Sequence, residues 1–146
     1  MEKSIQERKL TKKDYPLGSK SPDLLYTPTQ KSYNNLTLDA ALNGEVTGAD
    51  LRISPKTLEM HADISESLGR NQLSKNFRRA AEMINISDAR ILEIYNALRP
   101  NRSTKDELLA IADELENEYG ATENAGLIRE AADVYERRGR LKQIEE

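Results

Sequence analysis

The sequence predicts a mostly α-helical protein, a small helical bundle with an irregular, proline-containing N-terminal arm. Two observations predict this fold class. Apolar residues beyond position 54 recur every three or four positions, the spacing of one helix face. Prolines at positions 16, 22 and 28 prevent a regular helix before that point. We expect three segments: a flexible basic N-terminal segment (1–13), an extended arm with short helical turns (14–53) and a helical domain (54–146).

The first twenty residues are basic, with six lysines and arginines against three acidic residues, a local charge of +3 on a chain whose net charge is −3. A solvated terminus is the expected structure. The alternative is a short docking helix that places Ile5 and Leu10 on a partner. Both interpretations stay open at this point.

The arm is too apolar for a free linker, because Leu17, Leu24, Leu25 and Tyr26 lie among its prolines. An ordered arm that lies along a partner and a loop on the chain's own domain fit this composition equally well. Further on, Thr37 is placed to cap a brief helix over 38–42.

The helical domain is expected to start at Ser54-Pro55. The Ser54 hydroxyl can accept a hydrogen bond from a backbone N–H of the first turn, and a proline at the first helical position costs no helical hydrogen bond. One apolar stripe continues in phase on both sides of Gly69. We therefore predict one long helix over 55–84, with a break at Gly69 as the alternative. The stripe consists of Leu58, Ala62, Leu73, Phe77, Ala80 and Ile84.

Three further helices are predicted by their terminal residues. Hydroxyl caps are expected at Ser87, Ser103 and Thr122, and stops at Arg99-Pro100 and Gly120. The last helix carries two apolar stripes, which predicts two neighbours. One neighbour can be this chain's own helices, and the other a different polypeptide.

The chain is poor in reactive side chains. It has no cysteine, and His61 is its only imidazole, so sites of several histidines or thiolates are excluded. None of the glycine-rich phosphate loops, zinc-protease or serine-hydrolase motifs is present. We expect no catalytic, cofactor-binding or metal-binding residue on this chain, and His61 is expected to be structural.

Composition limits the classes of partner. A net charge of −3 and a pI near 5.4 disfavour nucleic acid as a ligand, and no apolar run is long enough for a membrane span. We expect an intracellular protein with neither kind of contact. Because only 37% of the residues are hydrophobic, we expect part of the stabilising burial to occur against another chain.

The candidate functional residues are therefore partner contacts. Arginine forks suit carboxylates and carbonyls at interfaces, although pairing with acids of the same chain explains them equally well. We expect the interface to include Tyr15, Pro16, Arg78, Arg79, Tyr95, Arg99 and Arg102.

Several runs are similar to one known family, the small subunit of adenosylcobalamin-dependent diol and glycerol dehydratases. They include Asn76-Phe77-Arg78-Arg79-Ala80-Ala81-Glu82, Tyr95-Asn96-Ala97-Leu98-Arg99-Pro100 and Leu108-Leu109-Ala110-Ile111-Ala112-Asp113. The resemblance covers residues 14–141. Residues 1–13, the start of the last helix at 122–126 and the tail after Leu141 are the least similar.

The resemblance implies a heterohexamer of large, medium and small subunits, two of each. This complex would convert propanediol or glycerol to an aldehyde and water by a radical mechanism, a lyase reaction. Substrate, metal ion and adenosylcobalamin with its cobalt would be held by the other subunits, so that this chain stabilises the large one without catalysing. The resemblance further implies a cytoplasmic complex, sometimes enclosed in a bacterial microcompartment.

The alternative is a free-standing helical adaptor or regulatory protein that uses the same apolar stripes. A nucleic-acid module built on the four arginines would show steeply salt-dependent binding, and the net acidity opposes it. The choice between propanediol and glycerol does not follow from this sequence, since the selecting pocket would lie on another chain.

Overall fold

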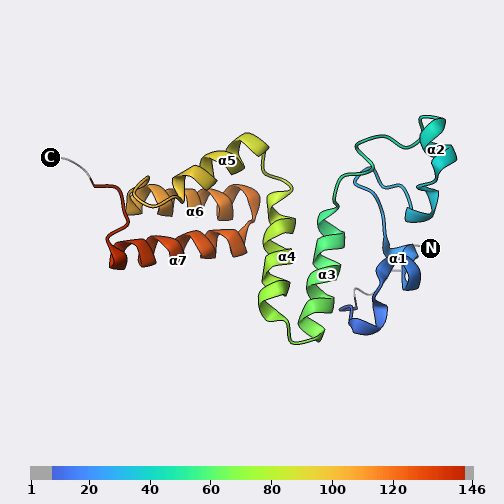
Figure 1. The fold of residues 1–146 in the computed structure, drawn as a ribbon, viewed down its shortest axis with the longest axis horizontal. Coiled ribbons are helices and arrows are strands. Elements are labelled where there is room, and N and C mark those ends of the chain that lie inside the picture. The colour runs from blue at the N-terminus through green and yellow to red at the C-terminus, as the bar shows by residue number, and fades with distance from the viewer. Residues whose placement is uncertain (1–7, 144–146) are drawn as a thin grey trace. The chain divides into compact units, whose positions relative to one another are not determined.

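The computed structural model describes residues 8–143 and shows a mostly helical chain, as predicted (Figure 1). The only β pairing among these residues is an isolated bridge between Tyr26 and Ser32. The chain divides into two compact units, residues 1–81 and 82–146. The predicted segment boundaries after residues 13 and 53 stay predictions.

The first unit contains short helical turns followed by a helical hairpin. The turns are η1 (Lys12–Asp14), α1 (Leu17–Lys20), η2 (Pro22–Leu24), η3 (Tyr33–Asn35) and α2 (Leu38–Leu42). The hairpin is formed by α3 (Pro55–Ser67) and α4 (Asn71–Met83), whose last two residues belong to the second unit. Thr37 accepts a hydrogen bond from the amide of Ala40, which confirms it as the cap of α2.

The small core of the first unit joins the start of the arm to α3. Its buried side chains are Leu10, Leu17, Met60 and Ile64, with Leu24 and Leu25 packed against them. This part of the arm therefore lies on the chain's own helix. Leu10, which belongs to the segment expected to be flexible, is part of this packing, and Ile5 lies outside the described residues.

The rest of the arm is held by polar contacts. Between residues 18 and 59 the only buried residues are Thr27 and Asp50. The Asp50 carboxylate accepts hydrogen bonds from the Thr27 and Thr29 hydroxyls, from Lys31 Nζ at 3.0 Å and from the Thr47 amide at 2.8 Å. Asp50 thus joins two turns that have no apolar core between them.

The prediction of one long helix over 55–84 is wrong, because the helix breaks at Gly69. Gly69 has φ +71°, and the amides of Gly69 and Arg70 bond back to the carbonyls of Glu66 and Ser65 at 2.9 Å each. These two bonds form a Schellman motif, which satisfies the last carbonyls of α3 and turns the chain. In the sequence the apolar positions stay in phase across Gly69, but they belong to two helices.

The stripe predicted for this region is also incorrect in detail. The buried residues are Met60, Ala62, Ile64 and Ser65 of α3 and Ser74 and Ala81 of α4, whereas Leu73 is 39% exposed. Once the helix breaks, α4 turns a different face toward α3. The Ser54 hydroxyl makes no capping bond, although Pro55 does begin α3 as predicted.

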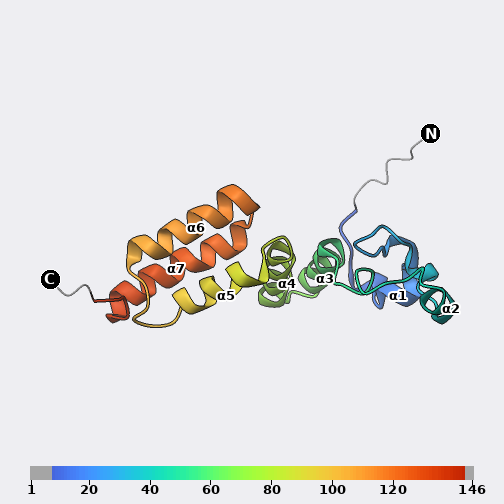
Figure 2. The same ribbon diagram turned by 90° about the horizontal axis from the view of Figure 1, so that it is seen from above.

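The second unit is a three-helix arrangement of α5 (Asp88–Ala97), α6 (Lys105–Tyr119) and α7 (Thr122–Arg138). The long helices α6 and α7 run antiparallel side by side, as both ribbon views show (Figures 1 and 2). The core of this unit is apolar. Its buried members are Ile86, Ile94, Leu108, Ala112, Leu115, Ala121, Ala125, Ile128 and Ala132.

Two predicted caps in this unit are wrong. Thr104, not Ser103, caps α6 and forms a capping box with Glu107, while the Ser103 hydroxyl donates to the Ala97 carbonyl. Thr122 lies inside α7 and makes no cap bond. The Glu82 carboxylate, distant in sequence, accepts instead from the amides of Glu123 and Asn124 at 2.9 and 3.0 Å. The predicted cap at Ser87 and the stop at Gly120, whose φ is +63°, are confirmed.

Candidate partner-binding site

The predicted interface residues fall into both units. Tyr15, Pro16, Arg78 and Arg79 belong to the first unit, and Tyr95, Arg99 and Arg102 belong to the second. The three residues of the second unit lie on α5 and on the connector that follows it, residues 98–104.

In the first unit the arginines are engaged within the chain. Arg78 donates to Glu66 at 2.7 Å and forms an ion pair with Asp63, which joins α4 to α3. The Arg78 guanidinium, followed by Lys9, lowers the pKa of the Glu66 carboxyl below its usual value. Arg79 donates to Asn76 at 2.6 Å. These contacts support the hairpin.

Tyr15 and Pro16 are both exposed, Tyr15 to 54%, and the peptide bond between them is cis. The Tyr15 ring meets His61 edge-on at 6.4 Å, and the His61 ring stacks on Phe77 at 5.5 Å. The only imidazole of the chain is thus part of the packing between α3 and α4.

In the second unit, hydrogen bonds join the connector to α5, to α7 and to residues 140–142. The Tyr135 hydroxyl donates to the Leu98 carbonyl at 2.6 Å, and the Ser103 hydroxyl donates to the Ala97 carbonyl at 2.9 Å. The Asn101 amide donates to the Arg140 carbonyl, and the Lys142 amide donates to the Ser103 carbonyl, at 2.8 and 2.9 Å. The connector and residues 140–142 therefore run together as one fixed surface.

Helix α5 presents two apolar side chains outward beside this surface. Ile91 and Ile94 pack against the core, whereas Tyr95 is 67% exposed and Leu92 is 61% exposed. A surface tyrosine with an exposed leucine one turn away is typical of a protein interface.

Three other cations of this unit form ion pairs with its acids. Arg90 donates to Glu114 and Glu93, which raises the pKa of Arg90. Lys105 forms ion pairs with Asp133 and Glu136, and Arg129 does so with Asp113 and Glu116. Glu114, one of the acids of α6, is thereby tied to α5.

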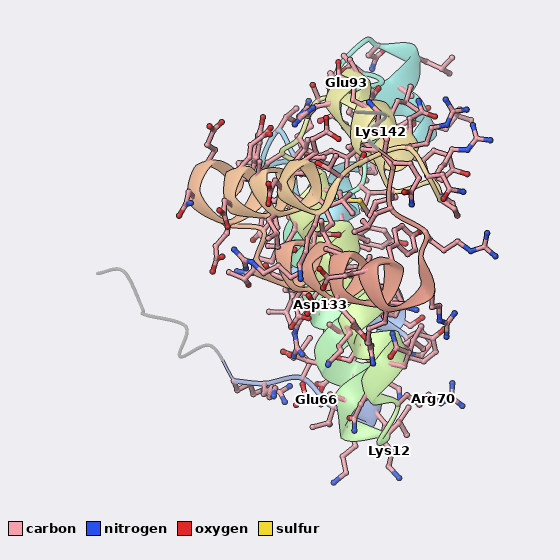
Figure 3. All side chains as sticks on the ribbon, turned by 90° about the vertical axis from the view of Figure 1, so that its left-hand side faces the viewer. Lys12, Glu66, Arg70, Glu93, Asp133 and Lys142 are labelled. Carbon is pink, nitrogen blue, oxygen red and sulfur yellow. The ribbon has the colours of Figure 1, made fainter. Side chains whose placement is uncertain are left out.

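The cations at the connector make no such pairs, and neither do Arg137 and Arg138 in the last turn of α7. Four exposed side chains carry charge here without an ion pair to any residue that the structure describes. They are Arg99, Arg102, Arg140 and Lys142, which we call the connector patch. Lys142 is labelled in Figure 3, in the chain beyond the end of α7. The patch is a local positive surface on an acidic protein.

A shallow depression of about 510 Å³ adjoins the patch. Its floor includes the apolar side chains of Ala97, Ala110 and Ile111, and Arg102 lies on its lining. The remaining lining residues are Asn96, Ser103 and Glu107. Its size suits one or two side chains of a partner.

Sequence reasoning missed Arg140 and Lys142 because they are about forty positions from Arg99 and Arg102 in the chain. Only the reversal at Gly139, whose φ is +62°, brings them beside the connector. Gly139, which follows a run of helical residues, was the signal in the sequence. A glycine at this position predicts that the helix ends and the chain turns, but it does not predict which segment the chain then contacts.

Residues 8–143 hold no cluster of three histidine, cysteine or carboxylate side chains arranged for a metal ion. Among the same residues, no helix has the length and apolar character needed to cross a membrane.

The sequence comparisons agree with this picture. The model of the family described as dehydratase small subunit matches residues 10–142. The chain is 53% identical over 129 residues to a propanediol dehydratase small subunit from Citrobacter freundii, a match that covers 88% of this chain and 75% of that protein. A propanediol dehydratase small subunit from Salmonella typhimurium gives the same identity and coverage.

A mostly helical chain that leaves apolar side chains exposed beside a positive surface has the features of a subunit of a larger assembly. The chain belongs to the dehydratase small subunit family. It is thus one subunit of a multi-subunit dehydratase, a lyase, and the free-standing adaptor is the less favoured interpretation.

Proposed function

We propose that this chain is the non-catalytic small subunit of an adenosylcobalamin-dependent diol dehydratase. The complex converts propane-1,2-diol or glycerol to an aldehyde with loss of water. It contains large, medium and small subunits, two of each, and the large subunit carries the catalytic residues. The relatives' names support propanediol as the substrate of the assembly.

The observation that carries this proposal is apolar surface that the chain leaves uncovered. Among the described residues, six large side chains are between 61% and 75% exposed, namely Leu38, Leu42, Leu51, Ile53, Leu92 and Tyr95. Burying such side chains against a partner stabilises each by roughly 1.5–3 kcal/mol. The arm of this chain is held by the hydrogen bonds of Asp50 and has no apolar core of its own, so burial against a partner is its main source of further stability.

The residues of this chain do not fit the cobalamin cofactor. Imidazole is the nitrogen ligand that suits transition metals, and this chain has one imidazole, His61. The His61 ring is stacked on Phe77. The described residues offer no other donor cluster. The proposal therefore leaves adenosylcobalamin and its cobalt to the large and medium subunits.

The proposal includes a cytoplasmic location, with enclosure in a bacterial microcompartment as its finer form. The basic N-terminal segment is the candidate packaging element, and most of it lies outside the described residues. Deletion of residues 2–13 that leaves the location of the complex unchanged would remove the support for this role.

Reconstitution tests the function. We expect the purified chain to show no dehydratase activity with propane-1,2-diol and adenosylcobalamin, and co-expression with the large and medium subunits to yield an active complex that contains it. Aldehyde formation is the readout. Full activity and stability of the other two subunits without this chain would overturn the proposal, as would activity of the chain alone.

A further inference from the structure

We infer that the connector patch and the adjoining depression bind an acidic segment of the large subunit, whose carboxylates face the patch and whose apolar side chain enters the depression. This inference rests on the proposed function, because it names the chemistry of a partner segment that the function requires. It concerns the second unit alone.

Charge complementarity identifies the occupant. The four cations of the patch make no ion pair with the described residues, and Arg137 and Arg138, which precede Arg140 in the last turn of α7, add two more positive charges without such a pair. Two of the patch cations are arginines on the connector, and a guanidinium fork binds a carboxylate through two parallel hydrogen bonds. A surface of this kind selects an acidic partner and disfavours a basic one.

The depression adds an apolar requirement. Ala97, Ala110 and Ile111 offer no hydrogen bond from their side chains, so a polar group placed on this floor would lose its water without compensation. The carboxylate of Glu107, which also lines the depression, already accepts from the Thr104 amide at 2.8 Å. An aliphatic or aromatic side chain flanked by acids fits both features.

The surface is built before the partner arrives. Two side-chain and two backbone hydrogen bonds fix the connector, and Asn101 takes a left-handed conformation with φ +62°. A partner therefore does not have to order this backbone, which reduces the entropic cost of association.

The test uses the assembled complex, with the affinity tag on the large subunit and the release of this chain timed on the resin in 50 mM and 500 mM NaCl. We expect Arg99→Glu with Arg102→Glu to speed release by about 10-fold or more, and Arg99→Gln with Arg102→Gln to weaken the salt dependence. A separate variant, Ala110→Phe, fills the depression and should also speed release.

Matched controls are available on exposed positions. Arg70→Glu with Lys75→Glu makes the same change of net charge in the first unit, and Ala89→Phe adds the same ring elsewhere on the second unit. We expect both to release within about 2-fold of the unmodified chain, the range of surface substitutions. Circular dichroism of each purified complex checks that the helices are retained.

The outcomes separate the two proposals. If the unmodified chain never joins the other subunits, the proposed function fails. If it joins them and the patch and depression variants release no faster than their controls, only this inference fails. Binding of a 20-base-pair DNA duplex that is lost in Arg99→Glu with Arg102→Glu, while subunit release is unchanged, would assign the patch to nucleic acid and overturn it.

Discussion

Asp50 shows how one residue can take the place of a core. No apolar side chain is buried between residues 18 and 59. The two buried residues there are Thr27 and Asp50, and the Thr27 hydroxyl donates a hydrogen bond to the Asp50 carboxylate at 3.2 Å. Hydrogen bonds from Thr29 and the Thr47 amide, followed by Lys31, hold the pKa of the Asp50 carboxyl well below its usual range. Such a carboxylate stabilises the fold only while it is ionised.

The sign of the pH dependence follows from that shift. Because the folded-state pKa of Asp50 is lowered, its contribution is present above the unfolded-state value of about 3.9 and is lost as pH falls toward the folded-state value. We expect Asp50→Asn to lower the urea midpoint at pH 7 and the difference from the unmodified chain to shrink below pH 4. Asp23→Asn, at an exposed position, is the control. A pH-independent difference would contradict this account.

Helix limits depend on contacts from different parts of the sequence. Gly69 ends α3 with a local Schellman motif, whereas α7 receives its cap from Glu82, about forty residues earlier. Local signals of the first kind are readable from sequence. The second kind follows only from the packing of the folded chain.

The break at Gly69 predicts the sign of the stability change that Gly69→Ala causes. In a continuous helix Gly69→Ala would stabilise the protein, but at φ +71° it should destabilise it by about 1 kcal/mol. Gly126→Ala is the matched control, since Gly126 lies inside α7 with no atom within 4 Å of an added Cβ. There we expect stabilisation by roughly 0.5–1 kcal/mol. Urea unfolding measures both, and equal signs would contradict the assignment of the break.

The cap from Glu82 gives a second prediction at this scale. Glu82→Ala removes the acceptor for the amides of Glu123 and Asn124, and a lost helix cap costs about 0.5–2 kcal/mol. Hydrogen exchange should quicken at those two amides first. Glu118→Ala, on the exposed face of α6, should leave them protected. Unchanged exchange in Glu82→Ala would show that α7 does not depend on this cap.

For the molecule as a whole, the start of α3 was predicted from Pro55, and the mostly helical class was predicted from periodicity, because both signals lie between neighbours in sequence. Periodicity predicted the helix over 55–84 wrongly, since apolar positions that stay in phase across Gly69 fit two helices as well as one. Of the candidate site, Tyr95, Arg99 and Arg102 were readable from their segment. Arg140 and Lys142 were not, because the backbone bonds at the connector bring them there.

Exposure of Tyr95 gives a prediction for the assembly. Its ring is 67% exposed in the chain alone, so Tyr95→Ala should leave the chain's own stability within about 0.5 kcal/mol. If the ring is central in the interface, its loss should weaken assembly by about 2 kcal/mol or more. Tyr33→Ala, at a tyrosine that is 45% exposed in the first unit, provides the comparison. Equal retention of both variants in the purified complex would remove Tyr95 from the interface.

The central claim is that this chain binds the catalytic subunits of a dehydratase and buries its exposed apolar side chains against them. Native mass spectrometry of the complex purified from cells that express all three subunits tests it most directly. The account predicts a particle with two copies of this chain beside two large and two medium subunits. A particle of large and medium subunits that is complete and active without this chain, with the chain recovered as a free monomer, would contradict it.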